Sequence, residues 1–407
     1  MAILKREYIC PYCFTKHKIN NVKFRCSNED HVEEDTVYKN YWKVSRILGK
    51  VIQPVEKKGV LSWLNPTMPE TASCDGESEK CKNSVTRTRI CPTCHSTLPS
   101  TIADYEDYIF AIIGAKDTGK SHFISILIER INNEIGNVYN CFLQPGDDST
   151  IRRYKENFYN PLFKNKVALN VTRSASEDDE VNKPLLYTLS INGEGVLGKK
   201  VITLAFFDTA GEDLNDELNM IKHNRYICNS SGIICLLDPL QLEKVREQLQ
   251  GQNTDVDLPS ANPETGVNEV LMRTTNMIRN TLGIEMKKKI TIPMALSFSK
   301  IDAIQPLLDP SSHLNQKSKH TNQNGFDIVD FENINNEMEG LVREWSRGNI
   351  PQLLEHNYKV FAYFGVSALG HDPGPSKVIK DIVPYRVEDP FLWLLWKNGI
   401  IKGNNRK

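Results

Sequence analysis

The chain has no excess of either charge, no long apolar run and no internal repeat. Its 407 residues carry 50 Lys and Arg against 51 Asp and Glu, a formal net charge of -1, so no overall basic field favours nucleic acid or an acidic membrane as a partner. No stretch approaches the ~18 uncharged apolar residues of a membrane span. The N-terminus, Met1 to Glu7, has no apolar core of signal-peptide length. We therefore expect a cytosolic protein that does not span a membrane.

Cysteine is present and unevenly distributed. Seven of the ten cysteines lie in the first 94 residues. A small secreted protein uses such a density for disulfides, whereas a cytosolic chain of this length more often uses it to bind metal. Residues 1–100 are therefore predicted to form a small zinc-binding module of the zinc-ribbon or rubredoxin-like knuckle type, in which metal supplies much of the folding energy.

Two C-P-x-C turns, 10–13 and 91–94, each present two thiolates from one tight loop, as a zinc knuckle does. The preferred pairing places Cys10, Cys13, Cys91 and Cys94 on one ion. Cys26, Cys74, Cys81 and, as an optional member, His31 would then hold a second ion. A pairing in chain order, with Cys10, Cys13, Cys26 and His31 on the first ion, stays open. Ligand sets made mainly of thiolates leave no open position for water, so a structural role is favoured over a catalytic one.

The stretch 114–121 reads G-x-x-x-x-G-K-S. An apolar run of strand length, 108–113, precedes it, and a stretch able to form a helix, 122–130, follows. This setting is typical of a phosphate-binding loop, whose backbone N–H groups face phosphate oxygens at the start of a helix. Lys120 would reach the β- and γ-phosphates, and Ser121 would bind Mg²⁺. The predicted nucleotide contacts of the loop are Gly114, Lys116, Asp117, Thr118, Gly119, Lys120 and Ser121.

Further buried strands are predicted at 185–191, 200–207, 232–239, 291–298 and 359–366. With helical stretches between them, they indicate an α/β domain over 101–407 with a mostly parallel sheet covered on both faces. In such a sheet the ligand loops lie at the carboxyl ends of the strands. Helical insertions are expected at about 239–290 and 303–358, the second with an apolar stripe from Ile328 to Trp345 that is more typical of a core than of an interface.

Three short motifs follow strand ends: D-x-x-G at 208–211, S-K-x-D at 299–302 and S-A at 367–368. Together with the phosphate loop, and in this order, they resemble the motif series of Ras-like GTPases, with S-K-x-D in place of the commoner N-K-x-D. The resemblance implies that Asp208 holds Mg²⁺ and that the Gly211 N–H faces the γ-phosphate. It also implies that Asp302 accepts from the guanine edge, that Lys300 lies along the base, and that Ser367 and Ala368 complete the base pocket. GTP or GDP is thus expected rather than ATP.

The whole chain resembles the bacterial double-GTPase family. The resemblance is carried by C-P-Y-C-F, F-R-C and C-P-T-C-H-S-T-L-P near the N-terminus, by the GTPase motifs, and by V-E-D-P-F-L-W-L-L at 387–395. That family is associated with multi-gene bacterial conflict or anti-phage systems, so the resemblance implies a regulatory GTPase acting beside protein partners. A second GTPase or a homodimer is one expected partner, while nucleic acid and membrane are not expected.

The catalytic details depart from the Ras-like pattern. Glu212 follows Gly211 at the position where Ras-like enzymes usually carry a water-positioning Gln, and Lys116 stands where small residues are common. The switch threonine, a further Mg²⁺ ligand, is assigned to Thr172, with Thr150 as the alternative. We expect slow GTP hydrolysis that rises when a partner completes the site. The alternatives are a zinc-module GTPase acting on RNA or the ribosome, and a nucleotide-binding scaffold without significant turnover.

Overall fold

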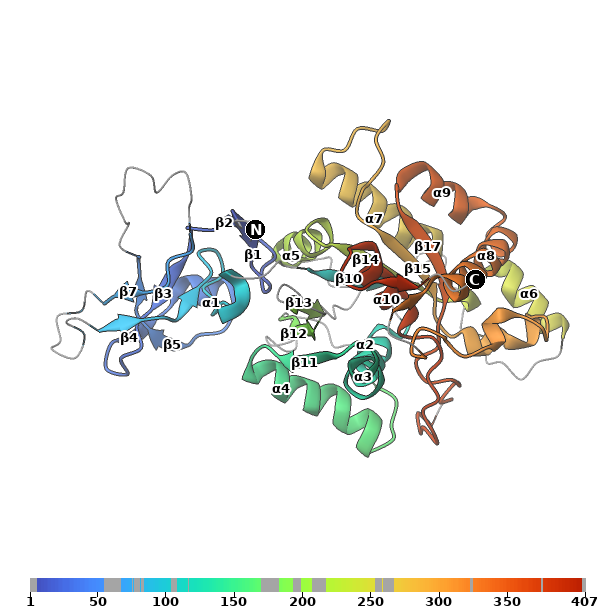
Figure 1. Ribbon diagram of the computed structural model, residues 1–407, viewed down its shortest axis with the longest axis horizontal. Helices are drawn as coiled ribbons and strands as arrows, with labels where there is room; N and C mark the ends of the chain where they lie inside the picture. Colours follow the sequence, from blue (N-terminus) through green and yellow to red (C-terminus); the bar gives the residue numbers. More distant parts are fainter. Residues whose placement is uncertain are drawn as a thin grey trace.

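The structure is a computed structural model. It describes residues 6–54, 67–74, 76, 81, 84–103, 108–115, 117–169, 183–192, 199–206, 217–252, 258, 267–322, 325–374 and 376–404. Figure 1 shows a small N-terminal module at one end of an elongated molecule and a larger α/β part that contains the rest of the chain. None of the helices in the described ranges combines the length and hydropathy needed to cross a bilayer.

The N-terminal module is built from short strands and one helix, α1 (Thr36–Trp42). The strands are β1 (Glu7–Ile9), β2 (Lys16–Lys18), β3 (Lys23–Arg25), β4 (Val32–Glu34), β5 (Ile47–Gly49), β6 (Val51–Ile52), β7 (Ala72–Ser73), β8 (Val85–Thr86) and β9 (Arg89–Ile90). They form the antiparallel pairs β1-β2, β4-β5 and β7-β8 and a three-stranded sheet in the order β6-β3-β9. Small modules with such short strands often rely on a metal or another cross-link in addition to their core.

A four-stranded parallel sheet forms the centre of the larger part, in the order β10 (Phe110–Gly114), β14 (Gly232–Leu237), β15 (Met294–Phe298) and β17 (Phe361–Gly365). The register pairs Gly114 with Leu236, Leu237 with Phe298, and Phe298 with Gly365. All four strands therefore end at the same level, and the loops that follow them leave from one edge of the sheet.

Helices cover both faces of this sheet, as expected for a parallel sheet. Strand side chains alternate between two cores: Ala111 and Ile113 join the core shared with α5, α7, α8 and α9, whereas Phe110 and Ile112 join the core shared with α2 and α10. The longer helices are α2 (Lys120–Arg130), α4 (Asp148–Tyr154), α5 (Glu217–Cys228), α6 (Glu243–Gly251), α7 (Val267–Leu282), α8 (Ile328–Trp345), α9 (Asn349–Asn357) and α10 (Asp389–Lys397).

Both predicted insertions contain helices. The first holds α6 and α7, and the second holds α8 and α9, with the α8 stripe buried at Ile334, Met338, Val342 and Trp345.

The apolar segment near the C-terminus forms α10, which packs closely on β14. A Cβ added to Gly232 would lie 2.5 Å from Leu394 Cδ2. Phe391 meets Phe110 edge-on at 5.9 Å between ring centroids.

The expectation of a mostly parallel sheet is corrected at three strands. The strands β11 (Cys141–Pro145), β12 (Leu185–Asn192) and β13 (Lys199–Phe206) form a separate antiparallel sheet in the order β11-β12-β13. Only six residues separate β12 from β13, which is enough for a hairpin but too short for the crossover that parallel neighbours need. The strand β11 was not predicted, because its apolar run is only three residues long and ends at Gln144 and Pro145.

Candidate functional site

The predicted phosphate loop connects β10 to α2. Asp117 and Gly119 both adopt left-handed backbone conformations, with φ of 64° and 80°, and Gly119 is the residue before the first turn of α2. The Lys120 ammonium folds back over the loop and donates to the Gly114 carbonyl at 3.0 Å, and the Thr118 hydroxyl donates to the Ala115 carbonyl at 2.9 Å. A lysine held over a loop at a helix N-terminus is an arrangement suited to an anion.

Gly114 has no room for a side chain. A Cβ there would lie 2.7 Å from both the Leu236 carbonyl oxygen and Thr118 Oγ1. Close packing of the loop against β14 therefore requires glycine at its first position.

The S-K-x-D motif follows β15, one strand beyond β14 in the sheet. Lys300 has a φ of 53°, and its ammonium lies 2.6 Å from the carboxylate of Asp238, which is almost fully buried at the end of β14. Asp302 lies at the start of a 3₁₀ turn, Ile301–Leu307. Burial raises the pKa of Asp302, and a hydrogen bond with Ser367 opposes that rise. The sheet thus brings Lys300, Asp302 and Ser367 to one edge, together with Asp238.

His122 links the loop to two other segments. Its Nε2 accepts a hydrogen bond from the Leu169 backbone N–H at 3.0 Å. Burial, together with the nearby Lys300 ammonium, lowers the pKa of His122 to about 4, so the ring is neutral at neutral pH. Neither His122 nor Asp238 was singled out from the sequence, although both directly adjoin a predicted element: His122 follows Ser121, and Asp238 follows an apolar strand.

Several predicted residues lie outside the described ranges. These are Lys116, Thr172, Asp208, Gly211 and Glu212. Of the expected Mg²⁺ ligands, only Ser121 lies within them. Thr150, the alternative switch threonine, is buried at the start of α4, where its N–H binds Asp147 and its hydroxyl accepts from the Leu186 N–H at 3.0 Å. These bonds give Thr150 a structural role.

The first cysteine group joins the two C-P-x-C turns. Cys10, Cys13, Cys91 and Cys94 are buried, with their sulfurs all within 4.8 Å of one another. Cys10 Sγ lies 3.8 Å from Cys94 Sγ, and Cys13 Sγ lies 3.6 Å from Cys91 Sγ. Zn–S bonds of ~2.3 Å in a tetrahedron place sulfurs roughly 3.8 Å apart, so the group could bind a metal such as zinc. Burial raises the pKa of the Cys10 and Cys94 thiols, a cost that a bound cation offsets.

The second group contains Cys26, Cys74, Cys81 and His31, the last through its Nδ1 atom at 3.1 Å from Cys74 Sγ. Cys26 Sγ lies 3.5 Å from Cys74 Sγ. The residues are therefore grouped as in the preferred pairing, with His31 beside the three cysteines, and the pairing in chain order is not formed.

Neighbouring polar groups contact the sulfurs of both groups. The Asn28 side chain donates to Cys81 Sγ at 3.0 Å, and His17 Nε2 lies 3.4 Å from Cys91 Sγ. The sequence offered no spacing signal for Asn28 or His17, because they act beside the predicted ligands and not as members of a C-x-x-C pattern.

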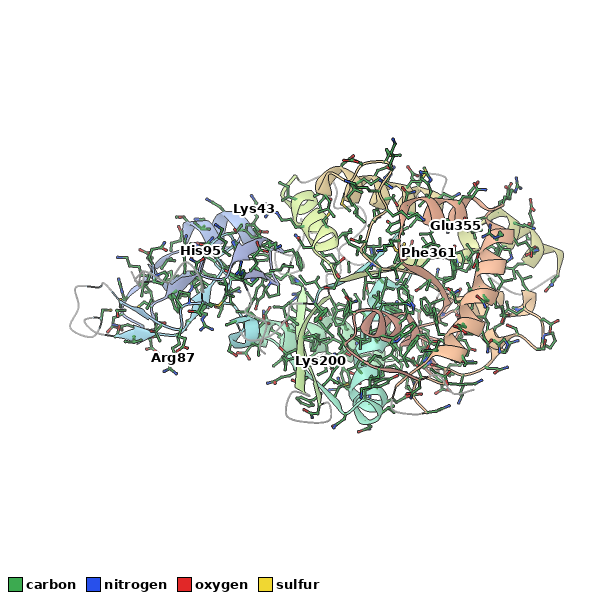
Figure 2. The ribbon with its side chains drawn as sticks, turned by 45° about the horizontal axis from the view of Figure 1, so that its top comes forward. Lys43, Arg87, His95, Lys200, Glu355 and Phe361 are labelled. Carbon is green, nitrogen blue, oxygen red and sulfur yellow. The ribbon has the colours of Figure 1, made fainter. Side chains whose placement is uncertain are left out.

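Other features of the described ranges carry no comparable site. His320, Asp330 and Asp389 lie together, but Arg386 donates to both carboxylates, at 2.9 and 2.6 Å, so each of them is already paired with a cation. Figure 2 shows the exposed residues Lys43 and Arg87 on opposite sides of the N-terminal module, with His95 inside it. These two residues do not form one basic face of the kind that RNA binding uses.

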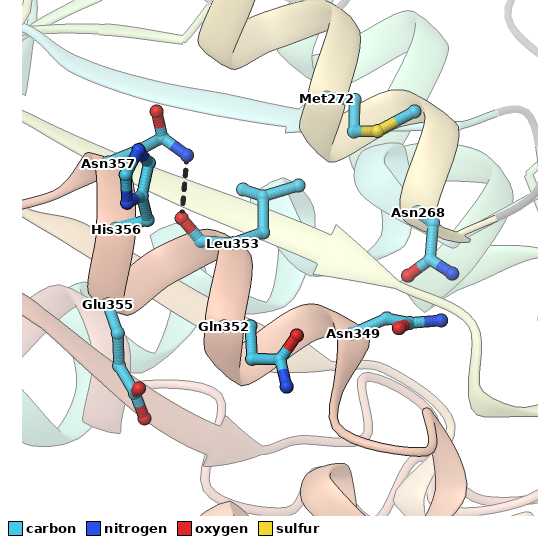
Figure 3. A pocket seen from close by; sticks show the side chains of 8 residues that line it. All are labelled: Asn268, Met272, Asn349, Gln352, Leu353, Glu355, His356 and Asn357. Carbon is cyan, nitrogen blue, oxygen red and sulfur yellow. Dashed lines mark hydrogen bonds between the residues drawn. The ribbon is translucent and has the colours of Figure 1, made fainter. Parts of the chain in front are cut away.

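A pocket of about 850 Å³ lies between α7 and α9 (Figure 3). It is lined by Asn268, Met272, Asn349, Gln352, Leu353, Glu355, His356 and Asn357. None of these residues belongs to a predicted motif.

Comparison with known proteins gives one distant similarity. No protein-family model matches the chain. It is 24% identical over 331 residues to a protein of Mycolicibacterium smegmatis named putative ESX-1 scaffolding and assembly protein SaeC, an alignment that covers 77% of this chain and 80% of that protein. At this level the chain is similar to a protein named for scaffolding and assembly, and the similarity assigns it to no family.

Proposed function

We propose that this protein binds guanine nucleotide with Mg²⁺, hydrolyses GTP slowly, and acts as a regulatory switch among protein partners. One observation carries the proposal: a Gly114–Ser121 loop with its lysine folded over it lies at the same sheet edge as Lys300, Asp302 and Ser367. The two sets supply the chemistry for the two ends of a nucleotide.

At the phosphate end, binding depends on backbone N–H groups and Lys120. Left-handed residues at Asp117 and Gly119 turn successive N–H groups towards one side, which makes a concave anion site. The Lys120 ammonium now bonds to a neutral carbonyl, a partner that a phosphate oxygen would replace with a stronger, charge-assisted bond.

At the base end, recognition depends on the half-buried carboxylate of Asp302. It would accept hydrogen bonds from two N–H donors of guanine, whereas adenine has no such donor pair and would leave the carboxylate unpaired. The Lys300–Asp238 ion pair fixes the lysine stem beside the base. We therefore expect preference for GTP over ATP.

Hydrolysis would be slow in the isolated protein. The sequence has Glu212 where a glutamine would orient the attacking water, and a carboxylate near the γ-phosphate repels it. A protein partner or a second copy would complete the site, as arginine-supplying partners do in other GTPases.

The similarity to a protein named for scaffolding and assembly supports a role in building a multi-protein complex, and the resemblance to double-GTPases points to a bacterial conflict system. The cysteine groups would hold two structural Zn²⁺ ions.

The decisive test is binding of fluorescent GTP, GDP and ATP analogues with Mg²⁺ to wild type, Asp302→Ala and Asp309→Ala. Asp309 is an exposed aspartate seven residues further on and serves as the matched control. We expect guanine-selective binding in wild type and Asp309→Ala, and selectivity reduced by about 10²-fold or more in Asp302→Ala. Equal or tighter ATP binding in wild type would refute the guanine assignment.

A second candidate function is a nucleotide-binding scaffold without turnover, which the name of the M. smegmatis protein favours. Single-turnover GTP hydrolysis, measured with and without the proteins encoded beside this one, separates the two. A Lys120→Ala variant that retained full biological activity would favour the scaffold.

A further inference from the structure

We propose that Tyr12 and Phe14, in the first cysteine turn, are positioning residues of the nucleotide site, so that nucleotide binding and metal retention by this turn affect each other. The inference rests on the proposed nucleotide function and deepens it. It concerns the contact between the N-terminal module and the α/β part, to which no role has been given above.

The two cysteine turns have the same backbone but different neighbours. The residue after each turn has a φ of 54°, Phe14 in the first and His95 in the second. Each donates its N–H to the first cysteine of its turn, at 2.8 and 3.0 Å. His95 points into the module, where its Nδ1 lies 2.8 Å from Asp35. Phe14 instead contacts the α/β part: its fully buried ring packs against Tyr226 of α5, 4.8 Å between centroids.

Hydrogen bonds between the α/β part and the residues of this turn accompany the ring contact. The Asn229 side chain donates to the Phe14 carbonyl at 3.0 Å, and Arg225 donates to the Thr15 hydroxyl at 2.9 Å. On the other side of the turn, the Tyr12 hydroxyl donates to the Asp147 carboxylate at 2.6 Å. The turn is thus held on one side by α5 and on the other by the start of α4, and the apolar core runs without interruption from the module into the sheet.

The Tyr226 contact leads directly to the phosphate loop. The hydroxyl of Tyr226 lies between β10 and β13, accepting from the Ile112 N–H at 3.0 Å and lying 2.9 Å from the Phe110 carbonyl and 3.3 Å from the Ala205 carbonyl. It therefore satisfies main-chain groups of the strand that ends at Gly114. A shift of the Tyr226 ring would leave the buried Ile112 N–H without its partner, which is costly, so Phe14 and β10 are coupled through one side chain.

The Tyr12 contact leads to a second element. Asp147 binds the Thr150 N–H at 2.6 Å and so caps α4, while the Thr150 hydroxyl accepts from the Leu186 N–H of β12. A third contact strengthens the same junction: the buried Lys183, just before β12, donates to the Tyr38 hydroxyl at 2.7 Å. In sequence, α5 follows the D-x-x-G motif and Lys183 follows the Thr172 segment. The module therefore touches the elements next to both motifs predicted to respond to the γ-phosphate.

These contacts hold α5 and β10 in place before nucleotide arrives, and such preorganisation favours binding. Loss of the contacts should weaken nucleotide binding. Coupling between two sites is reciprocal. Bound nucleotide should therefore stabilise the first cysteine turn, which carries Cys10 and Cys13, and slow the loss of its metal.

The test compares Tyr12→Phe and Phe14→Leu with Tyr8→Phe in the full-length, zinc-loaded protein. Tyr8 is a matched control, because it is a buried tyrosine of the same module whose hydroxyl donates to the Asn21 carbonyl within the module, at 2.8 Å. Mg²⁺–GTP affinity is measured by fluorescence, and the rate of zinc release to a chromogenic chelator is measured with and without Mg²⁺–GTP. We expect affinity to fall about 5-fold or more in both test variants and to stay within about 2-fold in Tyr8→Phe. We also expect nucleotide to slow zinc release in wild type and Tyr8→Phe but not in Tyr12→Phe.

Tyr12→Phe is the deciding variant, since it removes one oxygen atom and leaves the packing intact. If wild type binds guanine nucleotide while Tyr12→Phe matches it in affinity and in nucleotide-dependent zinc release, the inference is overturned and the proposed function stands. If wild type binds no guanine nucleotide, both are overturned.

Discussion

His122 shows how one side chain ties stability to pH. It follows Ser121 and accepts a hydrogen bond from Leu169, which requires a ring nitrogen without a proton. Its pKa in the folded protein is about 4, below the ordinary 6.5, because of burial and the Lys300 charge. Below pH 6.5 the unfolded chain takes up a proton that the folded chain does not, so folding stability should fall as the pH drops from 6.5 to 4.

We predict that His122→Gln, which keeps an acceptor, removes roughly 1–3 kcal/mol of this pH-dependent loss. Urea unfolding at pH 7, 6, 5 and 4 measures it, with His356→Gln as a control at an exposed histidine. Parallel curves for wild type and His122→Gln over the whole range would contradict the assignment.

Two other residues, Gly114 and Asp238, explain why the phosphate loop and the S-K-x-D motif lie together. Gly114 permits close packing of the loop on β14, and Asp238 binds Lys300.

At the level of elements, the cysteine turns are the clearest test of how the module is built. Because each group offers four ligands, loss of one cysteine should release the ion from its own group and leave the other group loaded. We predict that Cys13→Ser and Cys74→Ser each lower bound zinc from about two equivalents to about one. Elemental analysis after gel filtration measures it, with Cys141→Ser, a cysteine outside both groups, retaining two. Loss of both ions in either variant would show that the groups depend on each other.

Most strands of the α/β part could be predicted from the sequence, but not which strands pair with one another. The strands that became β10, β12, β13, β14, β15 and β17 were predicted because each is an apolar run of strand length, and four of them (β10, β13, β15 and β17) lead into motif residues. The grouping of cysteines followed from their spacing in two like turns. The antiparallel pairing of β12 with β13 was missed, because apolar content does not specify strand direction. No contact with the α/β part was predicted for Phe14 or Tyr12, because a residue that packs across a junction leaves no periodic signal in its own short turn.

The whole molecule combines an α/β part with apolar cores on both faces of its parallel sheet and a module of short strands with two cysteine groups that could bind metal. The sheet part has apolar cores on both faces of β10, β14, β15 and β17, whereas the module has strands of two or three residues. We predict that stripping metal with a thiol reagent and chelator exposes the amides of β3, β6 and β9 to hydrogen exchange while those of the parallel sheet stay protected.

Hydrogen exchange followed by mass spectrometry measures this, and re-adding Zn²⁺ provides the control by restoring protection. Unchanged protection of the module in metal-free protein would mean that its core, and not metal, stabilises it. Loss of protection along β10 as well would show that unfolding of the module also destabilises this strand, through the contact at Tyr226.

The arrangement of the two cysteine groups also sets an order of assembly during synthesis. Cys10 and Cys94 meet across 84 residues, and the second group, from Cys26 to Cys81, lies wholly inside that span. The inner group is complete once residue 81 has left the ribosome, and it closes the shorter loop, whose entropic cost is lower. Its ion should therefore be captured first, and the outer ion second. Even then the ring of Phe14 stays uncovered until α5, more than 200 residues further along, has been made. The first turn is thus made long before α5, the helix whose Tyr226 packs on its Phe14 ring, so the side of the turn that faces the α/β part stays exposed until synthesis has passed residue 226.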